Sequence, residues 1–502
     1  LQYDAFGRVV SSTDANGNVS TQQYDRLGHV VIVTDPLHAN TSSTYDAFGR
    51  IATRTDALGN VTAYAYDQQA RSVSVTTPEN ITVVTTRNRS GQVLSVTDGN
   101  GNTVTYAYDK NGNLLSTTTP LTTTSSSYDN AGRVMETTDA NGNKVVMTYD
   151  AANRVLTRTV DPSGLGIVTQ YAYDAKGQQI SVTDPNGTVT QFFYDLKGQL
   201  SRQVTDPAGL ALLTSYSYDG RGKTLSVTSP GGTQVRYSYD KLGRRVLEQL
   251  DPNGLNQIKT YVYDKNGNVV SSTDAGGYQT RYVYDADNRL VYTVDALGNV
   301  QGSDYDAAGH VVRTVSYASA IDITGLSNAL TLGQIQARIV ASQSGDIIVD
   351  RVYDKDGRLT ATVREIGGVS GEVTSYVYDA DNNVTRTIVY ANRITLAGWI
   401  RGTSPAPVAD SAHDADTRTV YDQLGRAIYS IDSSGAVTAQ KFDGNGNVIE
   451  RISYARFIPT NTTLTQSALT TALASIADSA RDVHVRNTYD AANRLTWSVN
   501  GV

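Results

Sequence analysis

Residues 3–25, YDAFGRVVSSTDANGNVSTQQYD, begin and end with the same Tyr-Asp pair and carry a second Asp-x-x-Gly in the middle. Tyr-Asp recurs along the whole 502-residue chain, at first with a constant spacing of 21 residues. Two degenerate copies, Arg87-Asn88 and Phe442-Asp443, bring the number of repeats to 20. A fixed period of this length is typical of repeat architectures, in which each unit packs against its neighbours. The Tyr-Asp pairs begin at Tyr3, Tyr24, Tyr45, Tyr66, Tyr108, Tyr128, Tyr149, Tyr173, Tyr194, Tyr218, Tyr239, Tyr263, Tyr284, Tyr305, Tyr353, Tyr378, Tyr421 and Tyr489.

Each repeat consists of two similar halves. Tyr3-Asp4 is followed by Gly7, and Thr13-Asp14 is followed by Gly17, with a β-branched run after each glycine. Asp and Asn accept hydrogen bonds from nearby backbone N–H groups, and Gly adopts positive φ, so both halves predict tight turns. The runs between the turns, such as RVVSST and TVTYAY, alternate in polarity and are rich in Val, Thr and Tyr, which indicates strands. Each repeat is therefore predicted to form one β-hairpin and the turn to the next.

Twenty such hairpins give about 40 strands, and at ~4.8 Å per strand the ribbon would extend ~190 Å in its hydrogen-bonding direction. Open twisted sheets rarely exceed ~10 strands without curling or splitting. We therefore predict an all-β fold: a long antiparallel ribbon of β-hairpin repeats wound into a spiral hollow shell or tube. Residues 1–502 are expected to form one continuous unit, with regular repeats over 1–305 and repeats with long, partly helical insertions over 306–502.

The aromatic content is dominated by tyrosine, with 32 Tyr against 6 Phe and 2 Trp. Tyr buries its ring while its hydroxyl stays hydrated, which suits the wall of a hollow body better than a dry core. Many Tyr occur in i, i+2 pairs and so share one face of a strand. The sequence does not decide whether that face is inside or outside. The pairs are Tyr64/Tyr66, Tyr106/Tyr108, Tyr171/Tyr173, Tyr216/Tyr218, Tyr237/Tyr239, Tyr261/Tyr263, Tyr282/Tyr284 and Tyr376/Tyr378.

Composition disfavours several classes of protein. The net charge is −7 and no basic run is present, which disfavours nucleic-acid binding. No apolar run approaches the ~18–20 residues of a membrane span. Cysteine is absent, so disulfides and thiolate metal sites are excluded. The chain begins and ends within a repeat, and we therefore expect it to be a segment of a longer protein.

Three spacings are long, which predicts insertions near residues 317–350, 390–418 and 454–486. Each begins with Tyr-Ala, twelve residues after the aromatic residue of its repeat, so the three are related. The second holds a loop rich in Pro, Ala, Ser and Asp over residues 402–417. The insertions could be a gate or docking site for a partner, or could simply cover apolar strand surface, and we favour the second interpretation. The first and third contain apolar residues at helical spacing: Leu332, Ile335, Ile339 and Val340, and Leu469, Leu473 and Ile476.

Two motifs suggest chemistry but are better explained as turns. Asp-Pro-x-Gly-Leu begins at Asp161, Asp206 and Asp251, and because it recurs in register with the strands we interpret it as a turn rather than a cleavage site. A second motif resembles the start of a calcium loop, but its Gly is at position 4 rather than 6 and no Glu follows. Asn-Gly strongly favours hairpin turns, and a weak cation site is the alternative. This motif begins at Asp14, Asp98, Asp109, Asp139, Asp264 and Asp443.

No catalytic constellation emerges from the sequence. The five histidines form no metal-binding pair, and the carboxylates lie almost entirely at turn positions of the repeat. We therefore predict no enzyme activity, no cofactor and no metal. The residues expected to matter are those of the structural repeat: Tyr3, Asp4, Gly7, Tyr24, Asp25, Tyr45, Asp46, Tyr66, Asp67, Tyr108, Asp109, Tyr149, Asp150, Tyr194, Asp195, Tyr239, Asp240, Tyr284 and Asp285.

The frame Y-D-x-x-G-R, followed by T-D-x-x-G-N and T-x-Y-x-Y-D, closely resembles the RHS/YD-repeat family over the whole chain except the three insertions. That family includes bacterial polymorphic toxins, cocoon-forming components of insecticidal toxin complexes, cell-wall-associated proteins and teneurin ectodomains. The resemblance implies a hollow β-shell. The toxin members of the family also enclose a C-terminal toxin segment, which is cut free at Asp-Pro-x-Gly-Leu at the end of a terminal core region. No such core region is present and the three motif copies lie in mid-ribbon. We therefore do not predict for this chain the protease activity that cuts the segment free in the toxins.

The resemblance and the repeat together predict a non-catalytic structural wall that encloses or presents a toxin or effector segment encoded outside these residues. An extracellular or cell-surface fibre or adhesin is the alternative, and a carbohydrate-binding surface is the third hypothesis. The expected partners are an enclosed toxin segment of the same longer chain, or a cell-surface glycan or protein. We expect the protein to be secreted, extracellular or on the bacterial cell surface.

Overall fold

A computed structural model describes residues 1–342, 344–459 and 462–501. Over these residues, 41 strands form one antiparallel sheet, and two helices lie outside it. Successive strands pair with one another, with one exception. The short strand β35 (Ile394–Thr395) lies beside β33 (Ser370–Tyr378), which leaves β34 (Val384–Val389) to pair with β36 (Ala415–Tyr421). The predicted all-β ribbon of antiparallel hairpins is confirmed.

The first half of the ribbon consists of β1 (Gln2–Tyr3), β2 (Val9–Thr13), β3 (Val19–Tyr24), β4 (Val30–Thr34), β5 (Asn40–Tyr45), β6 (Ile51–Thr55), β7 (Val61–Asp67), β8 (Ser72–Thr76), β9 (Thr82–Arg87), β10 (Val93–Thr97), β11 (Thr103–Tyr108), β12 (Leu114–Thr118), β13 (Thr123–Tyr128), β14 (Val134–Thr138), β15 (Lys144–Tyr149), β16 (Val155–Val160), β17 (Ile167–Tyr173), β18 (Gln179–Thr183), β19 (Val189–Tyr194) and β20 (Leu200–Thr205). The second half continues with β21 (Leu212–Tyr218), β22 (Thr224–Thr228), β23 (Gln234–Tyr239), β24 (Arg245–Leu250), β25 (Gln257–Tyr263), β26 (Val269–Thr273), β27 (Gln279–Tyr284), β28 (Leu290–Val294), β29 (Val300–Tyr305), β30 (Val311–Ser316), β31 (Ile347–Tyr353), β32 (Leu359–Ile366), β37 (Ala427–Ile431), β38 (Val437–Phe442), β39 (Val448–Ser453), β40 (Val483–Tyr489) and β41 (Leu495–Gly501). The helices are α1 (Leu332–Gln336) and α2 (Gln466–Ile476).

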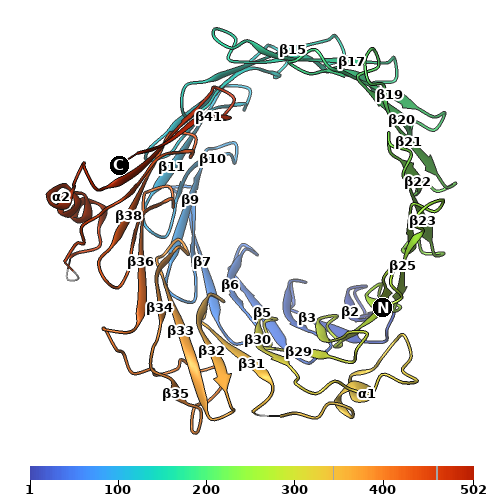
Figure 1. The fold of residues 1–502 in the computed structure, drawn as a ribbon, viewed down its shortest axis with the longest axis vertical. Helices are drawn as coiled ribbons and strands as arrows, with labels where there is room; N and C mark the ends of the chain where they lie inside the picture. The colour runs from blue at the N-terminus through green and yellow to red at the C-terminus, as the bar shows by residue number, and fades with distance from the viewer. Residues whose placement is uncertain (343, 460–461, 502) are drawn as a thin grey trace.

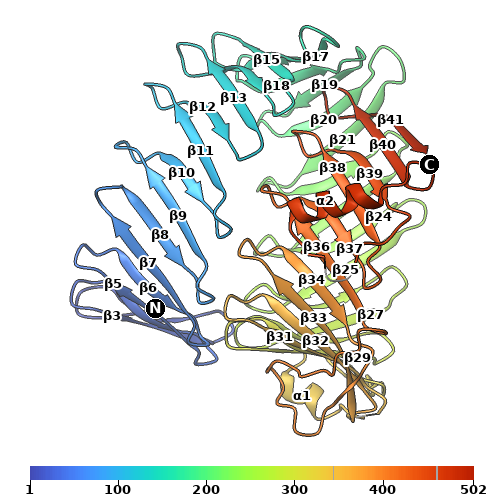
Figure 2. The same ribbon diagram turned by 90° about the vertical axis from the view of Figure 1, so that its left-hand side faces the viewer.

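The ribbon winds into a spiral around an open lumen. Figure 1 shows it passing once around the ring from β2 to β25 and then continuing past its own beginning. In Figure 2 the second winding lies beside the first along the spiral axis. A single twisted sheet of this length has to curl, and here the curvature closes a ring without pairing the two end strands.

The aspartate of each turn holds the backbone of that turn in place. In the third repeat, one carboxylate oxygen of Asp46 accepts hydrogen bonds from the backbone N–H groups of Phe48 (2.9 Å) and Arg50 (3.0 Å). The N–H of Gly49 donates to the Asp46 carbonyl, and Gly49 has φ +74°, a conformation that favours glycine. The predicted turn chemistry is therefore confirmed at this position, and the same pattern recurs in most repeats.

The repeat tyrosine completes the hydrogen bonding of a hairpin whose ladder is short. Strands β2 and β3 pair only over residues 11–13 and 19–21, so the carbonyl of Val9 has no ladder partner on β3. The hydroxyl of Tyr24 donates to that carbonyl over 2.7 Å. A buried backbone carbonyl without a partner is costly, and this bond explains why Tyr rather than Phe precedes the Asp. Equivalent bonds are made by Tyr45, Tyr66, Tyr128, Tyr149, Tyr173, Tyr194, Tyr218, Tyr239, Tyr263, Tyr284, Tyr305, Tyr353, Tyr378, Tyr421 and Tyr489.

The paired tyrosines face the lumen. Helix α1 lies outside the ring in Figure 1, and its Ile335 belongs to the same buried cluster as Val283 and Val294. Val283 therefore faces outward, and because side chains alternate along a strand, Tyr282 and Tyr284 face inward. Helix α2 gives the same result, since it packs with Ile431 and Val437 on the outer face of the second winding.

Buried apolar side chains are concentrated under the insertions. Within the described residues, every fully buried apolar side chain except Val160 lies between residues 270 and 473. The insertions thus cover apolar outer surface, as we favoured from the sequence. The helix predicted in the third insertion is confirmed, since Leu469 and Leu473 of its apolar face are buried. The helix predicted in the first insertion was too long. Helix α1 has only five residues, and Val340 lies beyond its end and is exposed.

A buried aspartate closes the base of each insertion. Asp482 is 2% exposed and accepts from the backbone N–H groups of Ala455 and Asp478, both over 2.8 Å. Asp346 and Asp414 occupy the same place in the first and second insertions and accept from the Ala of the other two Tyr-Ala pairs. The Tyr-Ala signal seen in the sequence therefore marks the entry of a common loop whose exit is an Asp.

Replacing Tyr218 by Phe is expected to destabilise its hairpin by about 1 kcal/mol, because the Leu200 carbonyl loses its donor at 2.7 Å. Tyr216 provides a matched control on the same face of the same strand, since within the described residues its hydroxyl has no protein partner. Hydrogen exchange of the β20–β21 amides measures the difference. Equal protection in the Tyr218→Phe and Tyr216→Phe variants would contradict the assigned role of the hydroxyl.

Replacing Asp482 by Ala is expected to release the base of the third insertion while leaving the strands paired, because two buried backbone donors lose their acceptor. Limited proteolysis should then cut within residues 455–482 at least several-fold faster than in the wild type. Asp482→Asn, which keeps one acceptor oxygen, should give an intermediate rate. Unchanged cleavage in the Ala variant would show that the apolar packing of α2 alone holds the insertion.

Candidate functional site: the seam between windings

The two windings meet along a line of turn-to-turn contacts, here called the seam. Turns that begin at the Asp of Tyr-Asp are called YD turns, and those of the second half-repeat are called TD turns. TD turns of repeats 1, 4, 5 and 7 contact YD turns of repeats 13, 16, 17 and 19. The offset is twelve repeats at every contact, and because a TD turn meets a YD turn, one winding contains 23 strands, for example β3 to β25 between Asn16 and Asn266.

Contacts at the seam are reciprocal. The side-chain amide of Asn16 donates to Asp264 over 3.0 Å, and that of Asn266 donates back to Asp14 over 2.7 Å. The backbone N–H of Asn16 also donates to the Asn266 side-chain oxygen over 3.0 Å. Each Asp-x-Asn turn therefore supplies both an acceptor and a donor to the turn it meets.

The same exchange occurs 125 residues further along the first winding, from Asn16 to Asn141. Asn141 donates to Asp443 over 2.9 Å, and Asn445 donates to Asp139 over 2.7 Å. The motif that resembled a calcium loop is thus a contact motif, and five of its six copies lie in the seam. The exception is Asp109, whose turn lies on the opposite edge of the first winding, away from the seam.

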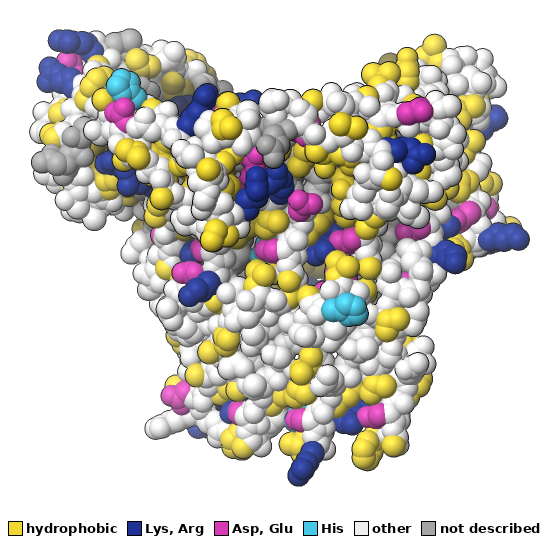
Figure 3. Space-filling view, turned by 90° about the horizontal axis from the view of Figure 1, so that it is seen from below, with side chains coloured by type: hydrophobic (Ala, Val, Ile, Leu, Met, Phe, Trp, Pro, Cys, Tyr) yellow, Lys and Arg dark blue, Asp and Glu magenta, His cyan; other side chains and the backbone are white. Residues whose placement is uncertain are grey.

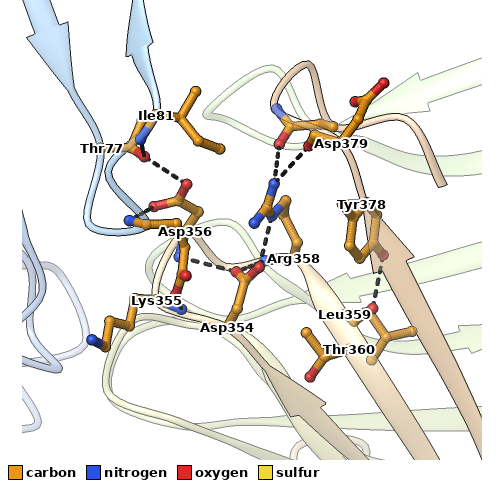
Figure 4. A network of polar contacts seen from close by, with 12 residues as sticks. Thr77, Ile81, Asp354, Lys355, Asp356, Arg358, Leu359, Thr360, Tyr378 and Asp379 are labelled. Atoms are coloured by element: carbon orange, nitrogen blue, oxygen red, sulfur yellow. Dashed lines mark hydrogen bonds and ion pairs between the residues drawn. The ribbon is translucent and has the colours of Figure 1, made fainter. Parts of the chain in front are cut away.

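The fourth repeat reaches the second winding with different side chains. Figure 4 shows Asp356 accepting from the Thr77 hydroxyl (2.7 Å), and it also accepts from the backbone N–H of Glu79 (3.0 Å). Glu79 in turn accepts from the backbone N–H of Lys355 over 3.1 Å. The pattern of mutual donation and acceptance is preserved although no Asn is present at either tip.

Seam carboxylates differ in pKa according to their partners. Burial opposes ionisation of Asp14, but hydrogen bonds from Asn18 and Asn266 lower its pKa to about 2. At the contact between repeats 5 and 17, burial and the facing Asp98 raise the pKa of Asp381. An ionised Asp at that tip cannot donate as Asn266 does; it accepts instead from the backbone N–H of Gly99 over 2.9 Å, while Asn100 still donates to Asp379 over 3.1 Å.

A cavity of about 830 Å³ opens in the seam between repeats 3 and 15. By the twelve-repeat offset the opposed tips there are Leu58 and Ala308, whose side chains can neither donate nor accept. Arg54, His310 and Asp356 are among the lining residues. The gap therefore coincides with the loss of polar tips, and it combines charged and apolar walls without a convergent set of catalytic groups.

Arginines connect neighbouring YD turns along the edge of the ribbon. Arg358 donates to its own Asp354 over 2.7 Å and to the carbonyl of Asp379 in the next turn over 3.2 Å. Its guanidinium also lies 5.1 Å from the ring centroid of Tyr378, which favours a cation–π contact. The Y-D-x-x-G-R motif is therefore one interlocked unit. Arg8, Arg133, Arg154, Arg244, Arg289 and Arg426 make the same contacts.

A buried carboxylate pair anchors the second insertion to the outer face. Asp350 is 2% exposed and Glu365 is 7% exposed, and Arg313 lies 3.3 Å and 3.4 Å from them. Arg401 of the insertion donates to Glu365 over 2.8 Å. Oδ2 of Asp350 has no hydrogen-bond partner within the described residues. Burial and the neighbouring Glu365 raise the pKa of Asp350 to about 6, whereas hydrogen bonding to Arg401 and Asp350 outweighs burial and lowers that of Glu365.

The structure places the predicted repeat residues in one common role, at the YD edge of the sheet. Asp67 is one exception, because no Gly follows it and the residue remains in strand β7, where it pairs with Ser72. Tyr3 is 57% exposed at the first hairpin. Asp350, Glu365 and the three basal aspartates of the insertions were missed, because nothing in their local sequence separates them from the turn carboxylates.

The described residues contain no group of three His, Asp or Glu side chains arranged to hold a metal ion. None of the helices in residues 1–342, 344–459 and 462–501 is long and apolar enough to cross a membrane. Figure 3 shows Lys and Arg intermixed with Asp and Glu on the face it presents, with hydrophobic side chains between them.

Comparison with known families assigns the fold. The RHS Repeat family model matches residues 3–39, 45–82 and 87–124, and the Teneurin YD-shell model matches residues 123–301. The chain belongs to the RHS/YD-repeat family. No curated protein matches its sequence.

Solved structures share this RHS/YD-repeat fold at low sequence identity. The crystal structure of TcdB2-TccC3-Cdc42 matches 99% of the chain with a TM-score of 0.54 at 14% identity. The crystal structure of TcdB2-TccC3 without its hypervariable C-terminal region matches 100% with a TM-score of 0.54 at 13% identity. A Photorhabdus luminescens Tc holotoxin pore matches 88% at 16% identity, with a TM-score of 0.45. The chain spans 30% of the length of the first two solved chains.

The second insertion of this RHS/YD-repeat wall is expected to loosen as pH rises. Because the folded pKa of Asp350 is about 6 and its ordinary value is 3.8, protonated Asp350 stabilises the anchored state below about pH 4. This contribution, no more than about 3 kcal/mol at ~1.4 kcal/mol per pKa unit, is lost as pH rises through 6. Trp399, packed in the second insertion, reports the change if exposed Trp497 is replaced by Phe.

In that background, acrylamide quenching of Trp399 should be stronger at pH 7.5 than at pH 5. Asp350→Asn imitates the protonated carboxyl and should abolish the difference, while Asp432→Asn, in an ordinary turn, should retain it. A pH response that persists in Asp350→Asn would contradict the assignment.

Proposed function

We propose that this chain is a non-catalytic structural wall of an RHS/YD-repeat β-shell that encloses a toxin or effector segment encoded outside these residues. The observation that carries the proposal is the spiral itself: successive windings lie side by side and hydrogen-bond through their turns, so the ribbon forms a continuous wall rather than an extended fibre.

The size of the lumen supports the proposal. A winding of 23 strands at ~4.8 Å per strand has a circumference of at least ~110 Å, or a diameter of ~35 Å between backbones. A folded domain of 100 residues has a radius of gyration of ~13 Å, so a small or partly unfolded segment fits. The inward tyrosines present rings with hydrated hydroxyls, a surface that can contact a polypeptide without the dry packing of a core.

The absence of a candidate catalytic site in the described residues also agrees with a structural role. Turn carboxylates are occupied by their own backbone and by Arg or Asn, and the buried pair Asp350/Glu365 is covered by the second insertion. The relatives of known structure are complexes of TcdB2 with TccC3, one of them lacking a hypervariable C-terminal region. By analogy we place the cargo in a separate C-terminal segment and the protein in a secreted or cell-surface setting.

Cryo-electron microscopy of the intact parent protein tests the proposal. A closed hollow shell with additional density in the lumen is the expected result, because the wall would then enclose a segment of the same chain. An open tube or fibre with an empty lumen would contradict it and favour the adhesin hypothesis. Mass spectrometry of the same preparation identifies any segment retained after proteolysis of the exterior.

A further inference from the structure

The seam joins turns that are twelve repeats apart, yet the separation in residues is not constant. It is 250 residues between Asn16 and Asn266 but 305 between Ala140 and Asn445, because the first two insertions fall within the longer interval. The strand ladder alone does not explain the constant offset, since it links each strand only to its neighbours. Either the curvature of the sheet or a feature of the facing turns selects it.

The third residue of each turn, here called the tip, makes or borders the inter-turn contact. On the first winding the tips of TD turns 1–8 are Asn16, Leu37, Leu58, Glu79, Asn100, Leu121, Asn141 and Ser163. On the second winding the tips of YD turns 13–20 are Asn266, Asp287, Ala308, Asp356, Asp381, Leu424, Asn445 and Ala492.

At the observed offset, polar tips meet polar tips and apolar tips meet apolar tips in six of the eight pairs. The mixed pairs are Leu37 with Asp287 and Ser163 with Ala492. An offset of eleven matches only two of seven pairs: Asn100 with Asp356, and Ser163 with Asn445. An offset of thirteen matches three of seven.

We propose that the tip side chains select the twelve-repeat offset and thereby set the number of strands per winding. Matched Asn and Asp tips exchange hydrogen bonds, whereas a shift of one repeat would place Leu121 or Leu424 against a polar tip that then has no partner. Specificity of this kind depends as much on the penalty in the wrong registers as on the contacts in the right one. The inference concerns the wall itself and holds whatever the wall encloses.

The lack of cysteine makes the offset measurable, because two introduced cysteines are the only thiols in the chain. Ala15 and Lys265 precede the tips Asn16 and Asn266, so Ala15→Cys with Lys265→Cys reports an offset of twelve. Ala15→Cys with Ala286→Cys reports thirteen. With a short bismaleimide, the first pair should cross-link at least ten-fold faster than the second, and the closed loop is detected by its mobility in a denaturing gel.

The tips are then changed without touching the reporter residues. Asn16→Leu, Asn100→Leu and Asn141→Leu on one side of the seam should lower the twelve-offset cross-linking rate at least three-fold. Adding Asn266→Leu, Asp381→Leu and Asn445→Leu on the other side should restore most of it, because the tips match again. Asn111→Leu with Asn186→Leu, two polar tips outside the seam, is the matched control and should leave the rate unchanged.

Recovery in the two-sided variant also shows that the one-sided variant did not simply fail to fold. If the one-sided substitutions leave the twelve-offset rate unchanged, or if the two-sided variant shows no recovery, tip matching does not select the offset. Sheet curvature would then set the number of strands per winding by itself.

Discussion

A sheet one layer thick with water on both faces has no dry core to hold its strands together, and every other feature of this protein follows from that constraint. Backbone hydrogen bonds must be completed locally, and the ladder of a TD hairpin such as β2–β3 is only three pairs long. The Tyr hydroxyl supplies the missing donor, the Asp carboxylate holds the turn, and Arg connects that turn to the next. Stability therefore comes from contacts between neighbouring repeats, which explains why the same six-residue motif is retained through most of the chain.

Where the constraint is relaxed, the composition changes. From about β26 onward the outward positions become Val and Ile, and these residues are buried only because the insertions lie over them. Each insertion returns to the sheet through an Asp that accepts two backbone N–H groups, so the long loops leave and rejoin the ribbon without disturbing strand order. The second insertion adds an ion-pair anchor that encloses Asp350, whose Oδ2 has no hydrogen-bond partner within the described residues, so burial of this carboxylate carries an electrostatic cost.

The sequence predicted much of this because the information is local. Turn chemistry, strand alternation and the sharing of a face by Tyr282 and Tyr284 all depend on residues a few positions apart. The direction of that face could not be predicted, since it depends on which side the insertions pack. Asn16 and Asn266 were recognised as turn residues, but their contact joins residues 250 positions apart and depends on the curvature of the whole sheet. Asp350 and Glu365 come together only because β31 pairs with β32.

The constant offset of the seam has a consequence for how such walls can change during evolution. The contacts count repeats rather than residues, so a TD loop can grow by some thirty residues, as the first insertion did, without affecting anything downstream. Loss or duplication of a single repeat in the first winding would instead displace every later contact, much as a one-base deletion disrupts a reading frame. Length variation in these proteins should therefore be frequent in the loops and, within a winding, rare in units of one repeat.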